Sequence, residues 1–169
     1  MIAELTGPVA ERVHSIQRKY DPKLAGMSPP HVTLVGSSGV GTIPRTTPAK
    51  LREMLEPITT TTAPITLRFE RPVRFMQTDI VALPLDPHGP LRTLHERIAK
   101  SGLGFGVAKH RYSPHVTLSY YPTLTPTAAR ELLAMRIDDP FVIDRVQLYF
   151  TMSPQSKKLL ELPLTGKPQ

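Results

Sequence analysis

The chain of 169 residues contains no cysteine, which excludes disulfide bonds and thiolate metal ligands. It also has no apolar run near the ~18 residues that a membrane span needs. Residues 1–8 carry Glu4 where a signal peptide would have a long apolar core. These absences predict a soluble, cytoplasmic protein without membrane association, and the length suits a single domain.

Acidic residues are outnumbered by basic ones: 14 Asp and Glu stand against 21 Lys and Arg, a formal net charge of +7. Such a balance favours polyanionic partners such as RNA or nucleotides. The sequence contains no Walker loop, no dinucleotide-binding fingerprint and no paired cluster of metal ligands. We therefore expect no cofactor and no metal, and we expect a monomer.

One pentapeptide, Pro-His-Val-Thr-Leu, occurs twice, at residues 30–34 and again at 114–118. Each copy predicts a short strand, because Val and Thr are β-branched and a proline at the strand entrance removes no ladder hydrogen bond. Side chains alternate along a strand, so the His and Thr of each copy share one face and the Val and Leu share the other. The two polar pairs are His31 with Thr33 and His115 with Thr117.

The rest of the chain predicts alternating helices and strands. Apolar residues at helical spacing, most of them after a cap and a proline, predict helices at residues 8–20, 48–56, 90–100 and 126–136. Further strands are expected at residues 2–5, 65–71, 80–85, 141–151 and 157–164, and a mobile loop rich in Gly and Ser at 36–42.

The two halves of the chain match in element order when they are offset by 84 residues, the separation of the two motifs. In that alignment the strand at 65–71 corresponds to residues near 149. We therefore predict an α+β fold: one domain of two similar lobes, approximately residues 1–75 and 76–164, related by a pseudo-two-fold axis. Each lobe would have an antiparallel sheet with helices on its outer face. The two histidine strands would line a cleft between the lobes.

Two imidazoles and two hydroxyls that face one cleft suit acid–base catalysis at a phosphate ester. Histidine has an ordinary pKa near ~6.5, so one ring can be neutral and the other protonated near neutral pH. One ring then takes a proton from water while the other protonates the departing oxygen. Thr33 and Thr117 would donate hydrogen bonds to the non-bridging oxygens, where charge develops. The scheme requires no metal.

The units His31-Val32-Thr33-Leu34 and His115-Val116-Thr117-Leu118 resemble the signature of the two-histidine (2H) phosphoesterase superfamily. This superfamily includes the RNA 2′,3′-cyclic phosphodiesterases, also called 2′-5′ RNA ligases. The resemblance implies a cyclic phosphodiesterase that opens a 2′,3′-cyclic phosphate on RNA or on a small nucleotide and leaves a 2′-phosphate. It further implies that His31 protonates the leaving group and His115 activates water, although the near-equivalence of the two copies leaves this assignment open.

Three residues near the second motif are candidate substrate contacts. Many RNA-processing members have an arginine after this motif, which the present chain lacks; Arg111, next to His110, supplies positive charge before it. In an unbroken strand Tyr121 would share the face of His115, where its ring could stack on a base, and Tyr120 would lie on the opposite face.

Two other interpretations remain open. The protein could hydrolyse a cyclic oligonucleotide or an ADP-ribose cyclic phosphate, because these reactions need the same groups and differ only in the pocket. Alternatively, it could be a non-catalytic module that binds nucleotides or RNA in the cleft. Substrate profiling distinguishes the first interpretation, and ligand binding without turnover would favour the second.

Overall fold

The computed structural model describes residues 1–36, 38–76, 78–121, 124–152 and 155–168. Within these ranges it contains the helices α1 (Gly7–Tyr20), α2 (Pro22–Met27), α3 (Pro48–Thr59), α4 (Pro90–Ala99) and α5 (Pro126–Ala134). The strands are β1 (Ile2–Glu4), β2 (His31–Thr33), β3 (Ile65–Leu67), β4 (Val73–Arg74), β5 (Val81–Pro84), β6 (His115–Ser119), β7 (Phe141–Ile143), β8 (Arg145–Met152) and β9 (Gln155–Pro163). Over the described ranges, no helix is both long enough and apolar enough to cross a membrane.

Each of the described helices has a proline in its first turn, where the missing N–H removes no intrahelical bond. Thr47 and Thr125 cap α3 and α5 as expected: each hydroxyl accepts a hydrogen bond at 3.2 Å from the backbone N–H three residues later. Helix α2 was not predicted. Pro22 follows the end of α1 at Tyr20 and begins this short additional helix.

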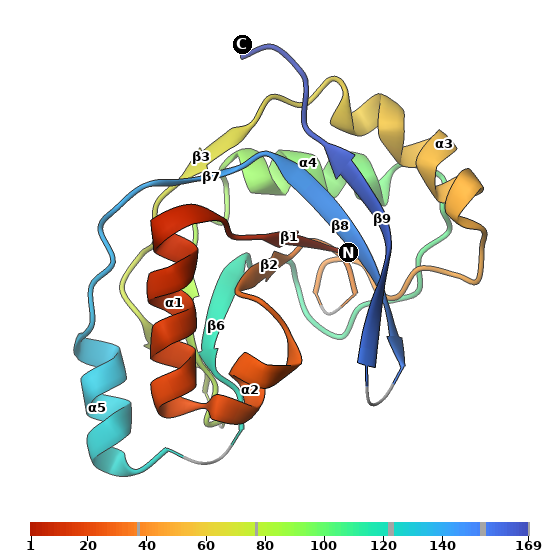
Figure 1. Cartoon of the computed structure of the whole chain (residues 1–169). Helices are drawn as coiled ribbons and strands as arrows, with labels where there is room; N and C mark the ends of the chain where they lie inside the picture. The colour runs from red at the N-terminus through yellow and green to blue at the C-terminus, as the bar shows by residue number, and fades with distance from the viewer. Residues whose placement is uncertain (37, 77, 122–123, 153–154, 169) are drawn as a thin grey trace.

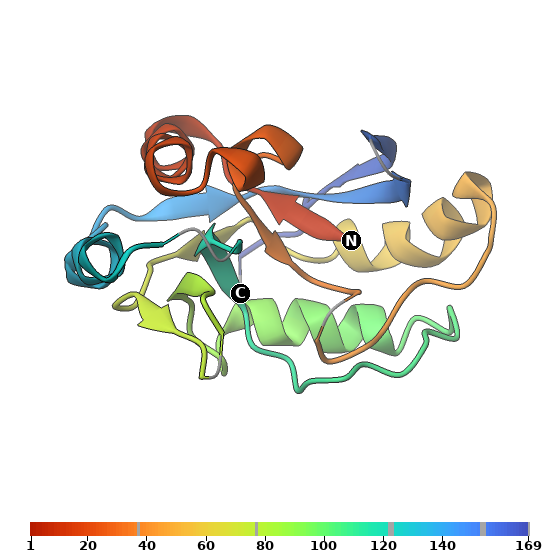
Figure 2. The same ribbon diagram turned by 90° about the horizontal axis from the view of Figure 1, so that it is seen from below.

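The strands form two antiparallel sheets (Figure 1). The larger has the order β4-β5-β6-β2-β1-β8-β9, and the smaller pairs β3 with β7. Figure 2 shows the strands running between α1 and α2 on one side and α4 on the other. The predicted α+β class, with antiparallel sheets and helices outside them, is confirmed.

The two copies of the repeated motif, β2 and β6, are adjacent antiparallel strands of the larger sheet. Val32 lies opposite Val116, and these residues hold the same position in the two copies. A local two-fold axis therefore passes between them. By the same register the cross-strand neighbours are His31 with Thr117 and Thr33 with His115. The two polar pairs thus lie side by side on one face of a continuous sheet.

The two halves exchange strands within that sheet. β4, from the first half, pairs with β5 of the second half, whereas β8, from the second half, pairs with β1 of the first half. The expected strand at 141–151 is divided at Asp144 into β7 and β8, which belong to different sheets. The counterpart of β3 is therefore β7 and not the chain near residue 149, because the offset between the halves changes along the chain.

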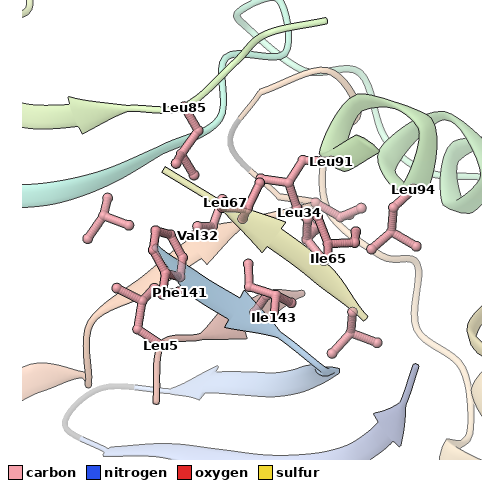
Figure 3. Packing of buried hydrophobic residues seen from close by; sticks show 14 of the residues in the cluster. Leu5, Val32, Leu34, Ile65, Leu67, Leu85, Leu91, Leu94, Phe141 and Ile143 are labelled. Atoms are coloured by element: carbon pink, nitrogen blue, oxygen red, sulfur yellow. The ribbon is translucent and has the colours of Figure 1, made fainter. Parts of the chain in front are cut away.

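The hydrophobic core lies against the face of the larger sheet that is opposite the histidines. Val32 and Leu34 alternate with His31 and Thr33, and both aliphatic side chains are completely buried. Figure 3 shows the side chains that pack around them from β3, β7 and the helix α4: Ile65, Leu67, Leu91, Leu94, Phe141 and Ile143. The smaller sheet therefore covers the apolar side of the histidine strands and leaves their polar side open.

Ile143 and Val142 are neighbours on β7 with opposite orientations, which allows a matched test of this core. Ile143 is 1% exposed and Val142 is 44% exposed. We expect Ile143→Ala to lower the free energy of unfolding by about 2–5 kcal/mol, because it leaves a cavity. Val142→Ala should cost less than about 1 kcal/mol. Urea unfolding of the two variants measures both values, and equal losses would contradict the orientation of β7.

Candidate active site

A pocket of about 680 Å³ lies over the polar face of β2 and β6. Its volume is within the range of sites that bind small molecules, roughly 300–1,000 Å³. Both histidines and both threonines of the repeated motif line it: His31, Thr33, His115 and Thr117. The structure therefore brings together the four residues that the sequence analysis placed in one cleft.

The two histidine rings are held in the same way. Nδ1 of His31 is 2.7 Å from the carbonyl oxygen of Pro29, and Nδ1 of His115 is 2.8 Å from that of Ser113. A carbonyl oxygen can only accept, so Nδ1 carries a hydrogen and donates it. Nε2 of each ring is then the atom that gains or loses a proton. A neutral ring can act as a base through Nε2, and a protonated ring can act as an acid through the same atom.

Burial lowers the pKa of His31 and of His115 below the ordinary value of 6.5. In their charged forms the amino terminus and His115 lower the pKa of His31 further, whereas the hydrogen bond to the carbonyl of Pro29 and the charge of Glu4 raise it. In the free protein at neutral pH, both rings are therefore mainly neutral. A bound phosphate anion would favour the protonated form and raise the pKa of a nearby ring.

The end wall of the pocket is apolar and comes from the segment that follows β4. The ring of Phe75 meets the ring of His115 almost at a right angle, with 5.0 Å between the ring centroids. Met76 and Ile80 lie beside it. The sequence analysis missed these residues, because nothing in their local pattern distinguishes them from ordinary loop and strand residues. The β4–β5 connection carries them to the pocket.

Positive charge reaches the pocket from the segment before the second motif. His110 and Arg111, both predicted as possible substrate contacts, line the pocket and are exposed. Within the described ranges, no group of three or more His, Asp or Glu side chains is arranged to hold a metal ion. In the described part of the pocket wall, the groups suited to binding an anion are therefore the guanidinium of Arg111 and side-chain hydroxyl and imidazole N–H donors.

The glycine-rich loop at residues 36–42 is hydrogen-bonded to this basic segment; residue 37 lies outside the described residues. Gly39 donates its N–H to the carbonyl of His110 at 2.8 Å, and Ser38 pairs with the same residue. Gly39 has a φ of +75°, and a Cβ at this position would come within 2.2 Å of the ring of His95. Glycine is therefore required here, and it lets the loop pack closely beside the pocket.

Tyr120, and not Tyr121, lines the pocket. The expectation for Tyr121 assumed unbroken alternation, but the pairing of β6 with β5 shifts by one residue at Leu118. The hydroxyl of Tyr121 donates to the sulfur of Met27 at 2.9 Å, and the ammonium of Lys23 lies 4.0 Å from its ring centroid. Tyr121 therefore contacts α2 and is not among the residues that line the pocket.

The fold and the paired motifs, which meet in one pocket, define a class: the two-histidine phosphoesterases. The family model described as the 2′-5′ RNA ligase superfamily matches residues 6–151. The chain belongs to this superfamily, which confirms the resemblance drawn from the repeated motif.

A solved structure supports the same fold. The chain is similar to E. coli LigT, whose crystal structure is described as a complex with NADP⁺. The two are 18% identical, the match covers 97% of this chain and 95% of LigT, and the TM-score is 0.59. At this identity the similarity establishes the fold alone. No curated protein sequence matches the chain.

The contact between Phe75 and His115 predicts a selective change in protonation. Phe75→Ala should admit water to the His115 ring and move its pKa upward, towards 6.5, because burial is the main cause of the lowered value. The pKa of His31 should change less. Following the imidazole Cε1 proton signals by NMR during a pH titration measures both values. An unchanged pKa for His115 would show that Phe75 does not shield it.

Proposed function

We propose that the protein is a phosphoric diester hydrolase, a metal-independent cyclic phosphodiesterase. It hydrolyses the 2′,3′-cyclic phosphate ends of RNA or of small nucleotides to a 2′-phosphate. The observation that carries this proposal is the equivalent placement of His31 and His115 on neighbouring strands of one pocket. Each ring donates from Nδ1 to the backbone, which leaves Nε2 for proton transfer.

The reaction needs two proton transfers at one phosphorus centre. Nε2 of the neutral ring takes a proton from water, and the water oxygen bonds to phosphorus. The bond from phosphorus to the 3′-oxygen breaks, and Nε2 of the protonated ring gives its proton to that oxygen. Following the family resemblance, we assign the acid to His31 and the base to His115. The hydroxyls of Thr33 and Thr117 donate to the non-bridging oxygens.

The remaining pocket wall suits a nucleotide. Arg111 places positive charge at the pocket, which favours a phosphorylated ligand, and His110 lies beside it. Tyr120 offers an aromatic ring on which any base could stack, and we assign this role to it in place of Tyr121. The similar LigT structure is described as a complex with NADP⁺, a nucleotide that carries a 2′-phosphate. This supports nucleotides as the ligand class.

The activity is tested with adenosine 2′,3′-cyclic phosphate in the presence of a chelator. We expect release of the 2′-phosphate, and we expect His31→Ala and His115→Ala each to lower kcat by about 10²- to 10⁴-fold. His88→Ala is the control, because His88 is exposed in a turn outside the pocket. If the wild type hydrolyses no cyclic-ended substrate but is stabilised by nucleotide, the protein is a binding module and the proposal is wrong.

The lowered pKa values predict where activity peaks. Turnover needs one neutral and one protonated ring, so kcat/KM should pass through a maximum. Because burial places the pKa of both rings below 6.5 in the free protein, this maximum should lie on the acid side of pH 6.5. Losing the base should remove the acid limb, and losing the acid should remove the alkaline limb. Profiles of His31→Ala and His115→Ala thus assign the roles, and a flat wild-type profile from about pH 5 to 9 contradicts the paired mechanism.

The threonine hydroxyls are tested by substitutions that preserve shape. Thr33→Val and Thr117→Val remove the hydroxyl and keep the branched side chain, so each should lower kcat by about 10²-fold, as the loss of a transition-state donor does. Thr33→Ser and Thr117→Ser keep the hydroxyl and should retain most of the activity. Steady-state kinetics compares the pairs. Equal rates for the Val and Ser variants would remove the threonines from the mechanism.

Substrate profiling tests the finer assignment. Adenosine 2′,3′-cyclic phosphate, an RNA with a 2′,3′-cyclic end, a cyclic oligonucleotide and an ADP-ribose cyclic phosphate can be compared by kcat/KM. We expect a preference for the first two. A higher kcat/KM for the cyclic oligonucleotide or the ADP-ribose cyclic phosphate would support the phosphodiesterase mechanism but contradict the proposed substrate class.

A further inference from the structure

The end of β6 has an irregularity that β2 lacks. Thr117 and Ser119 pair with consecutive residues of β5, so Leu118 between them has no partner there. The equivalent strand β2 pairs with β1 without a shift. An extra residue in one strand turns the following side chains towards the other face. Leu118 and Ser119 are accordingly both buried, and Tyr120 lines the pocket.

A buried carboxylate holds the backbone after this shift. One oxygen of Asp21 accepts hydrogen bonds from the N–H groups of Tyr120 at 2.7 Å and Tyr121 at 2.9 Å, and from the hydroxyl of Ser119 at 3.5 Å. The other oxygen accepts from the N–H of Leu24 at 2.9 Å and so begins α2. Asp21 is 1% exposed. Burial alone would raise its pKa, but these bonds outweigh burial and the pKa is lowered, so the group is an anion at neutral pH.

Gln17, a second buried side chain, lies on α1 one turn before Asp21 and contacts β6 before the shift. Gln17, four residues before Asp21, donates from Nε2 to the carbonyl oxygen of Thr117 at 2.7 Å. Its amide oxygen is buried and has no hydrogen-bond partner among the described residues, which is unfavourable. The hydrogen bond of Gln17 therefore anchors the carbonyl of Thr117, and Gln17 itself lines the pocket.

We propose that Asp21 is a positioning residue, which holds the shifted end of β6 so that Tyr120 presents its ring to the pocket as the surface for the substrate's base. The proposal depends on the proposed function for the identity of the ligand. The Asp21 side chain takes no part in proton transfer. It acts through Tyr120, so its loss should affect binding of the base more than the chemical step.

A double-mutant cycle between Asp21→Asn and Tyr120→Ala tests this coupling. In the wild type, both carboxylate oxygens of Asp21 accept hydrogen bonds from backbone N–H groups. Asparagine keeps the shape of this side chain but replaces one of the two acceptors by an NH₂ donor. Tyr120→Ala removes the ring on which the base would stack. We expect roughly a 5- to 100-fold rise in KM for adenosine 2′,3′-cyclic phosphate, with a much smaller change in kcat. Asp21→Asn should raise KM in the same way and add little in the Tyr120→Ala background.

Two controls separate positioning from a general loss of structure. Ribose 2′,3′-cyclic phosphate has no base, so both substitutions should affect its hydrolysis far less. Asp139→Asn removes an exposed carboxylate that is paired with Arg12, away from the pocket, and should leave the kinetics unchanged. Additive effects on KM, or equal losses on the ribose substrate, would overturn the inference.

Two further measurements keep the test decisive. If Asp21→Asn does not fold, as judged by circular dichroism, Asp21→Ser takes its place in the cycle, because serine can still cap α2 but is too short to reach the N–H groups of Tyr120 and Tyr121, and it should show the same non-additivity. If the wild type hydrolyses no cyclic phosphate, the proposed function fails. The cycle is then measured as Kd for adenosine 2′-phosphate by calorimetry, where non-additive losses support the inference and additive losses overturn it.

Discussion

The pairing of Val32 with Val116 is the constraint on which the rest of the site depends. These valines hold equivalent positions in the repeated motif, so their pairing places a local two-fold axis between β2 and β6. The axis puts each histidine beside the threonine of the other copy. A slip of one residue in either strand would move its His and Thr into the core and its aliphatic residues into the pocket. Burial of Val32 and Val116 therefore favours the register that the proposed chemistry requires.

The same sheet holds both histidine rings in a defined orientation, with Nδ1 bonded to the backbone, as the proposed proton transfers require. The carbonyls of Pro29 and Ser113 fix the two rings, and burial keeps both mainly neutral at physiological pH. In the proposed mechanism, a bound phosphate anion would favour the protonated form of one ring by lowering the cost of its charge. The ligand would then help to create the acid, and groups that are already oriented would not have to reorganise in the transition state.

Much of this site could be predicted from the sequence. The repeated motif gives the residue types, its strand pattern places His and Thr on one face, and its repetition makes the two copies structurally equivalent. The proline-started helices α1, α3, α4 and α5 could also be predicted, because a helix start depends mainly on neighbouring residues, whereas the short helix α2, which Pro22 begins, was missed. The division of the strands could not be predicted: β7 and β8 are continuous in the sequence pattern, and only tertiary pairing separates them at Asp144. Tyr120 and Phe75 were missed for related reasons. The first follows an irregularity in β6, beside Asp21 between α1 and α2, and the second lies in the connection between β4 and β5.

The central claim is that both imidazoles act on a single phosphate. NMR of ¹⁵N-labelled histidines during a titration with adenosine 2′-phosphate, the expected product, tests this claim most directly. We predict that the Nε2 signals of His31 and His115 shift together and saturate along one binding curve at a one-to-one ratio. A response from one ring alone, or separate saturation curves for the two rings, would contradict a shared phosphate site.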